Sequence, residues 1–236
     1  MEAEAKERHV HAVFEKIAPK YDFMNDLLSF RRHKAWRRFA LNKMNIQNGD
    51  TALDLCCGTC DWTIAIACRN GGAKVTGLDF SKQMLKYGQQ KIDRAGLQDS
   101  ITLIQGNAME LPFANDSFDF VTIGFGLRNL PDYKQALREM YKVVKPGGKV
   151  VCLELSKPVW QPFKAIYYLY FKHLLPLLGK LFAKSYEQYK WLPESLATFP
   201  DHRQLKKIFE EAGFEKTEVY PLTGGIAALH IGTKLK

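Results

Sequence analysis

A cluster of cysteines is the stretch of this sequence that most suggests chemistry. Residues 53–62 read LDLCCGTCDW, so that Cys57 and Cys60 form a C-x-x-C pair after a run typical of a strand. Pairs with this spacing occur in thioredoxin-like redox sites and in zinc sites, and the same turn can also serve only to bind a ligand. The rest of the chain must discriminate between these three kinds of site.

The remaining cysteines and histidines favour the ligand-binding turn. No second C-x-x-C is present, and His9 and His11, two positions apart, point to different faces of a helix, so we predict no metal site. We therefore interpret C-G-T-C as a turn of small side chains. A thiol oxidoreductase is the alternative, and it requires Cys57 or Cys60 to be an exposed thiolate of low pKa.

The elements that position this turn follow a regular alternation. Five β-rich runs separated by helical patterns start at residue 51: TALDLCC, KVTGLDF, ITLIQGN, FDFVTIGF and GKVVCLEL. Nearly apolar runs spaced by helices predict a parallel sheet covered on both faces. FEKTEVYPL and ALHIGTKL, joined by a Gly-Gly turn, predict an antiparallel pair at the sheet edge. We therefore expect an α/β fold with a mainly parallel seven-stranded sheet.

In such a sheet, ligands bind beyond the carboxyl ends of the strands, at the first strand-to-helix turn. Gly58 lies in that turn, and Asp79 ends the second run about twenty residues later, where an acid commonly accepts from ribose hydroxyls. Neither G-x-G-x-x-G nor G-K-S/T is present, which disfavours dinucleotides and P-loop ligands. S-adenosylmethionine fits, because its sulfonium and amino acid need carbonyls and carboxylates near Asp54.

With GNAMELPF after the third run and GFGLRN after the fourth, the sequence strongly resembles class I S-adenosylmethionine-dependent methyltransferases. The resemblance implies a Rossmann-like fold with a helical cap, and S-adenosyl-L-homocysteine as the product. Cys60 stands where these enzymes usually have a second glycine or alanine, and we expect it to narrow the space over the cofactor. The predicted cofactor contacts are Tyr21, Asp54, Gly58, Thr59, Asp79, Phe80, Asn107, Ala108 and Met109.

The flanking segments are more specific. YDFMNDLLSFRRHKAW and KVVKPGGKVVCLELSKP resemble the two signatures of the ubiquinone/menaquinone C-methyltransferases, with Lys142 in place of a usual arginine. FGLRN and YKWLPESLATFP extend the likeness along nearly the whole chain. The resemblance to the shorter Gram-positive members implies methylation of a prenylated naphthoquinol, demethylmenaquinol, in the last step of menaquinone synthesis. A benzoquinol of ubiquinone synthesis is the alternative substrate.

Methylation of a quinol carbon needs an in-line approach to the methyl group and a polarised neighbouring hydroxyl. We expect Arg128 to steady the developing phenolate, with a loop-shaping salt bridge as the alternative role. Asn129 is expected to orient the ring hydroxyl, and His202 and His33 are candidate bases. The other predicted substrate contacts are Asn25, Trp36 and Phe125.

We predict a single domain, with residues 1–48 as a helical extension and residues 156–200 as a helical insertion. The oily segment 159–182 is interrupted by charges and Pro176, so it is too broken to span a bilayer. We expect it to cap the substrate ring or to lie against the membrane, with a buried packing lid as the alternative.

The N-terminus is charged where a secretory signal would be apolar, and the 5 cysteines make a poor disulfide framework. A cytoplasmic protein is therefore expected, with peripheral contact at the inner face of the membrane. The oligomeric state stays open, a homodimer being one expectation.

The net charge of +9 and the run RRHKAWRR also admit an RNA methyltransferase. The fourth run ends in GFGLRN and not in an N-P-P-Y type of loop, so we expect no nucleic-acid partner.

Overall fold

The computed structural model describes residues 3–69, 73–158, 169 and 186–236, and a seven-stranded sheet organises them. The strand order is β3-β2-β1-β4-β5-β7-β6. The strands are β1 (Thr51–Leu55), β2 (Lys74–Asp79), β3 (Ile101–Gln105), β4 (Phe118–Gly124), β5 (Val144–Leu155), β6 (Lys216–Leu222) and β7 (Ala227–Thr233). The first five are parallel, and β7 runs antiparallel between β5 and β6. The predicted sheet and its antiparallel edge pair are confirmed.

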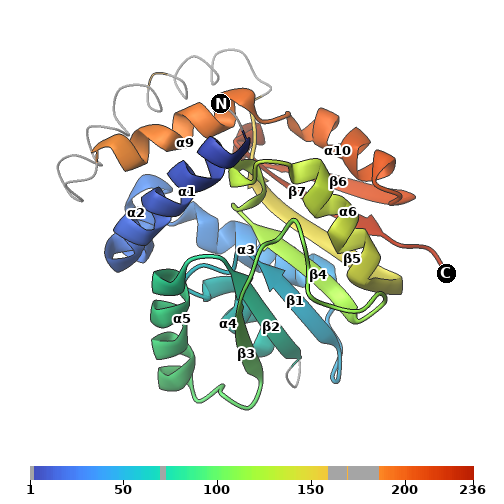
Figure 1. Ribbon diagram of the computed structural model, residues 1–236. Helices are drawn as coiled ribbons and strands as arrows, with labels where there is room; N and C mark the ends of the chain where they lie inside the picture. Colours follow the sequence, from blue (N-terminus) through green and yellow to red (C-terminus); the bar gives the residue numbers. More distant parts are fainter. Residues whose placement is uncertain (1–2, 70–72, 159–168, 170–185) are drawn as a thin grey trace.

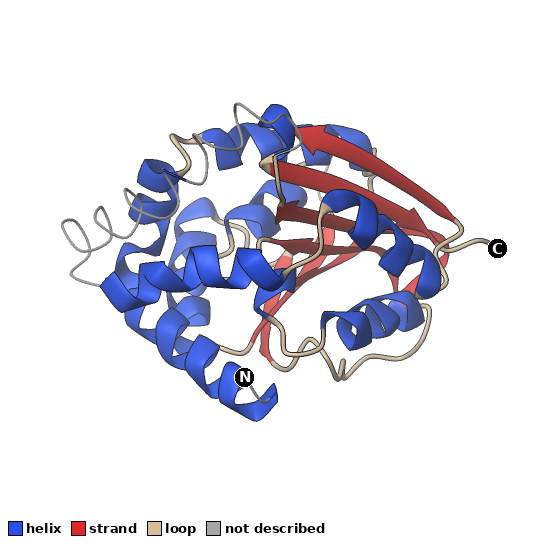
Figure 2. Cartoon of the chain, turned by 90° about the horizontal axis from the view of Figure 1, so that it is seen from above, coloured by secondary structure: helices blue, strands red, loops and turns tan. Residues whose placement is uncertain are grey.

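Helices cover both faces of this sheet (Figure 2). One face packs against α3 (Arg32–Met44), α4 (Asp61–Ala67) and α5 (Lys82–Ala95), and the other against α6 (Tyr133–Val143) and α10 (His202–Glu211). Side chains on one face of each helix are buried, as the apolar spacing predicts. The helix α6 ends just before the K-P-G-G sequence, because proline and glycine cannot continue it.

A separate group of helices lies across one end of the sheet. It comprises α1 (Ala3–Ile17), a short 3-10 turn (Ala18–Lys20), α2 (Tyr21–Leu28) and α9 (Tyr186–Thr198). Figure 1 shows α1 and α9 side by side above the strands, where the rings of His9 and Trp191 meet at 5.1 Å. Val13 and Ile17 of α1 are buried with Met24 and Leu196, so these helices share a small core of their own. They form a second layer over the strand ends.

The segment 159–182, for which we predict a ring cap or membrane contact, lies outside the described residues apart from residue 169. Among the helices that are described, none has the length and apolar character needed to cross a membrane.

Candidate functional site

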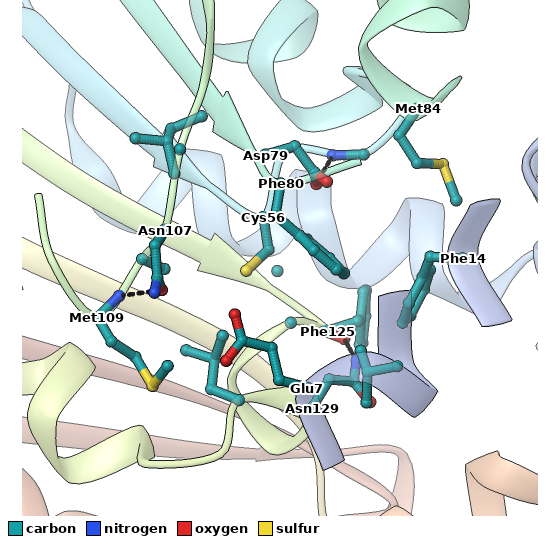
Figure 3. Close-up of a pocket in the computed structure, with 18 of the residues that line it drawn as sticks. Glu7, Phe14, Cys56, Asp79, Phe80, Met84, Asn107, Met109, Phe125 and Asn129 are labelled. Carbon is teal, nitrogen blue, oxygen red and sulfur yellow. Dashed lines mark hydrogen bonds between the residues drawn. The ribbon is translucent and has the colours of Figure 1, made fainter. Parts of the chain in front are cut away.

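A cavity opens at the carboxyl ends of the central strands, between the sheet and α1 (Figure 3). Its empty space, counted out into the open solvent at its mouth, is about 770 Å³. Nine of the predicted site residues line it: Tyr21, Gly58, Asp79, Phe80, Asn107, Ala108, Met109, Phe125 and Asn129. The structure therefore brings together side chains from α2 and from the loops after four different strands.

The turn after β1 has an unusual backbone. Cys56, Gly58 and Cys60 all have positive φ values, of 51°, 56° and 65°. Such values strain a residue that has a side chain, and strained residues concentrate where a ligand is bound. The N–H of Gly58 is held by Asp79 Oδ2 at 2.8 Å, so the turn is tied to the end of β2.

Asp79 is the buried acid of the cavity wall. Its other oxygen, Oδ1, accepts from the N–H of Ser81 at 2.9 Å, and the side chain is 5% exposed. Burial raises the pKa of Asp79 to about 6, against the lowering effect of the Ser81 and Gly58 amides. At neutral pH the carboxylate is charged, so it can accept hydrogen bonds from a ligand's hydroxyls.

Asp54 occupies a different environment, although it also ends a neighbouring strand. Its two oxygens accept from Thr63 Oγ1 and Thr122 Oγ1, both at 2.7 Å, and the side chain is buried beneath the turn. Burial raises its pKa to about 6. Asp54 does not line the cavity. Thr59 does not either, because its hydroxyl donates to Asp22 Oδ1 at 2.6 Å.

The C-x-x-C pair is buried in the structure. The Sγ atoms of Cys57 and Cys60 are 4.0 Å apart, and the pKa of the Cys57 thiol is raised by its hydrogen bond with Cys60 and by burial. A redox site needs an exposed thiolate of low pKa, so the thiol oxidoreductase hypothesis is wrong. The described residues also contain no cluster of metal-ligating side chains.

Cys60 does not narrow the cavity, contrary to our expectation. Its side chain faces α5, where a Cβ on Gly88 would lie 2.4 Å from the Cys60 sulfur. The absence of a side chain at Gly88 therefore makes room for the thiol. Cys56, by contrast, lines the cavity.

The loop after β4 forms the opposite wall. Phe125 has a φ of 61°, and its ring lies 6.2 Å from that of Trp36. The amide of Asn129 donates to the Phe125 carbonyl at 3.2 Å and accepts from Trp191 Nε1 at 3.0 Å. Asn129 is therefore held from two sides while it lines the cavity.

Arg128 does not present its side chain to the cavity. The Arg128 residue is 7% exposed, and its guanidinium donates to Glu154 Oε1 at 2.7 Å and to the Phe125 carbonyl. The backbone N–H of Arg128 donates to Glu154 Oε2 at 3.2 Å. This is the loop-shaping salt bridge that we gave as the alternative role. The guanidinium fixes the loop that carries Phe125 and Asn129.

The remaining predicted site residues lie apart from the cavity. His33 contacts Ser29 Oγ at 2.6 Å, and burial lowers its pKa to about 4. The indole of Trp36 donates to Thr223 Oγ1 at 2.9 Å, and the Asn25 side chain bonds to Tyr21. His202 begins α10, where its carbonyl accepts from His230 Nε2. His202 thus packs against the antiparallel strand β7 and not against the cavity.

Several lining residues were missed by the sequence reasoning. Glu7, Val10 and Phe14 come from α1, and Leu130 and Pro131 extend the loop after β4. The helical spacing identifies Val10 and Phe14 only as apolar positions, and this pattern indicates core packing and not a ligand site. No local pattern indicates that this helix crosses the strand ends, so Glu7 carried no signal as a site residue.

The charged side chains in the described lining of the cavity are all acidic. Among the described residues that line it, the carboxyl groups belong to Glu7 and Asp79, and none of the lining side chains is a lysine or an arginine. Burial raises the pKa values of Tyr21 and Cys56, so both stay neutral near pH 7. The cavity is therefore suited to a ligand that carries positive charge and hydroxyl groups.

Comparisons with known proteins find matches over nearly the whole chain. Residues 2–234 match the ubiE/COQ5 methyltransferase family. The chain is 55% identical to a demethylmenaquinone methyltransferase of Bacillus cytotoxicus and 56% identical to one of Bacillus cereus, each over 98% of both chains.

Solved structures with lower identity share the fold. A chain of the complex between the Haloferax volcanii Trm112 methyltransferase activator and a putative methyltransferase matches with a TM-score of 0.70 at 20% identity, over 94% of this chain and 98% of that one. Haemonchus contortus phosphoethanolamine N-methyltransferase 2 in complex with S-adenosyl-L-methionine matches with a TM-score of 0.63 at 16% identity, over 85% and 52%. Both show that the sheet and its helices have the class I methyltransferase arrangement.

Proposed function

The chain belongs to the ubiE/COQ5 methyltransferase family, and from this we propose that it methylates a ring carbon of demethylmenaquinol, a prenylated naphthoquinol, to give menaquinol. The protein is an S-adenosylmethionine-dependent methyltransferase. The names of relatives that are 55% and 56% identical over 98% of the chain support this substrate. The reaction would be the last step of menaquinone biosynthesis.

The observation that carries the cofactor proposal is the acid-lined cavity over a strained turn. S-adenosylmethionine fits it, because the cofactor has a sulfonium, an ammonium and two ribose hydroxyls and contains no phosphate that would need basic residues. When bound, it supplies a methyl group on a positively charged sulfur. S-adenosyl-L-homocysteine, the product, lacks the sulfonium charge, so the negative charge of Asp79 favours the methyl donor over the product.

We assign the cofactor to the wall formed by the sheet. The Asp79 carboxylate would accept from the ribose hydroxyls, and Gly58 would allow the ligand to approach the backbone. Asn107, Ala108 and Met109 would border the adenine ring; Asn107 Oδ1 already accepts from the Met109 N–H at 2.9 Å, which shapes that loop.

We assign the quinol to the space between Phe125, Asn129 and α1. The rings of Phe125 and Phe14 supply apolar surface for a naphthalene ring, and Asn129 supplies a hydrogen-bonding amide. Arg128 acts as a positioning residue through its contacts with Glu154 and Phe125. The chain thereby orients the ring carbon towards the methyl group without placing a cation against it.

We also propose peripheral contact with the inner face of the membrane. Phe23 and Phe30 are 56% and 72% exposed on α2 and the turn after it, and Arg32, which begins α3, is exposed as well. Exposed aromatic rings beside basic side chains suit an anionic bilayer surface. All 5 cysteines are free, which agrees with a cytoplasmic location.

The RNA methyltransferase hypothesis has less support. The basic run is partly neutralised within the protein, because Asp26 pairs with Arg31 and Lys34 and Asp61 pairs with Arg37. His33 and Trp36 of the same run are buried. The run therefore presents fewer free charges to a phosphate backbone than its composition indicates.

The experiment that tests the proposed function is a mass-spectrometric assay with S-adenosylmethionine and reduced prenyl-naphthoquinone, run beside a benzoquinol of the same prenyl length. We expect a naphthoquinol product that is one methyl group heavier. Methylation of the benzoquinol alone would move the substrate to the ubiquinone pathway. Cofactor binding without methylation of either quinol would refute the proposed substrate.

A further inference from the structure

The helix α1 places one carboxylate in the cavity that the cofactor assignment does not use. Glu7 reaches from the first half of this helix into the cavity, and Val10 and Phe14 line the same wall on the following turns (Figure 3). Glu7 lines the cavity while it stays exposed to solvent, so its carboxylate can reach a bound ligand and can also exchange protons with water.

The residue before Glu7 anchors the start of α1. Lys6 Nζ donates to the carbonyl of Leu130 at 2.6 Å and to that of Arg128 at 3.3 Å. Since these carbonyls belong to the loop after β4, the first turns of α1 are anchored beside Asn129. Glu7 is thus held near the end of the cavity that we assign to the quinol.

The other proton-accepting groups of the cavity are unsuited to the quinol. The Cys56 thiol and the Tyr21 hydroxyl keep their protons, because burial raises the pKa of both. Asp79 is bound to the backbone N–H groups of Gly58 and Ser81 on the cofactor side. The loop after β4 contributes no titratable side chain to the lining, and Lys6 is turned to the carbonyls.

We propose that Glu7 is the general base of the methyl transfer. This inference rests on the proposed function. The Glu7 carboxylate takes the proton of the ring hydroxyl, and the electron pair of that O–H bond forms a C=O bond. The ring carbon then bonds to the methyl group, and the electron pair of the methyl–sulfur bond stays on sulfur. The hydrogen on the methylated carbon then departs as a proton to water, and Glu7 returns its proton to the ring oxygen. One proton is released to solvent in each turnover.

The test is Glu7→Gln, which keeps the shape of the side chain and removes its basicity. We expect kcat to fall by about 100-fold or more, the usual contribution of a positioned base, while the calorimetric Kd for S-adenosylmethionine stays within about threefold. The rate of the variant should rise with pH up to alkaline conditions, because the quinol must then ionise by itself. Added formate should partly restore a Glu7→Ala variant.

The control is Glu15→Gln on the same helix, a residue outside the cavity lining that accepts from Ser81 Oγ at 2.7 Å. Glutamine keeps an acceptor oxygen there, so kcat should stay within about threefold of the wild-type value. An unchanged kcat in Glu7→Gln, or a parallel loss of cofactor affinity, would overturn the role as base. A wild-type chain that fails on naphthoquinol would instead refute the proposed substrate.

Discussion

The two walls of the cavity are built by different kinds of contact. The sheet wall is held by parallel strands and by bonds between side chain and backbone, such as that from Gly58 N–H to Asp79. The helical wall, formed by α1, rests on a small apolar core and is anchored near its start by Lys6. The sheet wall is therefore integral to the fold, whereas α1 can be loosened without disturbing the strands.

This difference between the two walls separates the binding of the cofactor from the binding of the methyl acceptor. A cofactor whose polar groups are always the same is best bound by the rigid sheet wall. There, Asp79 and the turn after β1 are already in position before the cofactor binds. A methyl acceptor with a long prenyl chain must enter and leave, which suits a wall that can shift. The account therefore predicts that changes in the sheet wall alter stability and cofactor affinity, and that changes in α1 alter turnover.

The largest expected effect comes from the buried salt bridge between Arg128 and Glu154, which holds the loop after β4. Glu154→Ala leaves the Arg128 guanidinium buried without its carboxylate, and we expect a loss of about 3 kcal/mol or more in the free energy of unfolding. Urea denaturation monitored by tryptophan fluorescence measures it. A loss below about 1 kcal/mol would show that the loop after β4 is not held by this pair.

Asp79→Ala should act next, on cofactor affinity. Removing a charged acceptor for two hydroxyls is expected to weaken S-adenosylmethionine binding by about 100-fold in calorimetry. Asp54→Asn is the matched control, since Asp54 is equally buried but outside the cavity lining. Equal losses in both variants would mean that the two acids share one role and that the cavity lining does not distinguish them.

Lys6→Met tests the helical wall. The change removes the bonds to the Arg128 and Leu130 carbonyls, and a charged donor of this kind contributes about 1.5 kcal/mol, or about tenfold in the equilibrium constant for docking of the helix. We expect kcat/KM for the quinol to fall by about tenfold with little change in the midpoint of thermal unfolding. A large drop in that midpoint would place α1 within the main cooperative unit.

The smallest effect is a pH dependence. The pKa of Asp54 is raised to about 6 in the folded protein, so its proton stabilises the fold at low pH and this contribution is lost as pH rises from about 4 to about 6. Between about pH 5 and about pH 7, Asp54→Asn should therefore gain about 1 kcal/mol relative to the wild type. His33 and His230 are present in both proteins, so their opposite effect cancels. A difference that is flat with pH would contradict the raised pKa.

Sequence reasoning reached the sheet wall because local rules determine it. Apolar runs spaced by helices imply a parallel sheet covered on both faces, and a ligand-facing acid such as Asp79 at a strand end follows from that topology. Asp54 obeys the same rule yet turns into the core, because Thr63 and Thr122 bind its oxygens. Whether an acid at a strand end faces the ligand depends on such tertiary partners. The spacing of residues in the sequence does not reveal them.

The helical wall was harder to predict for the same reason. The apolar spacing of Val10 and Phe14 fixes a helix but not where it docks, so Glu7 has no sequence signal of its own. Arg128 attracted a catalytic role because the sequence does not reveal that Glu154, on a different strand, lies within 2.7 Å of it.

One comparison tests the division between the walls most directly. Cofactor affinity by calorimetry and methyl transfer in a single turnover, at saturating S-adenosylmethionine, would be measured for Asp79→Ala and Glu7→Gln. The account predicts opposite losses: Asp79→Ala binds the cofactor about 100-fold more weakly, while Glu7→Gln binds it normally and transfers the methyl group about 100-fold more slowly. If both variants lose affinity and retain the transfer rate once saturated, the separation of cofactor binding from proton removal is contradicted.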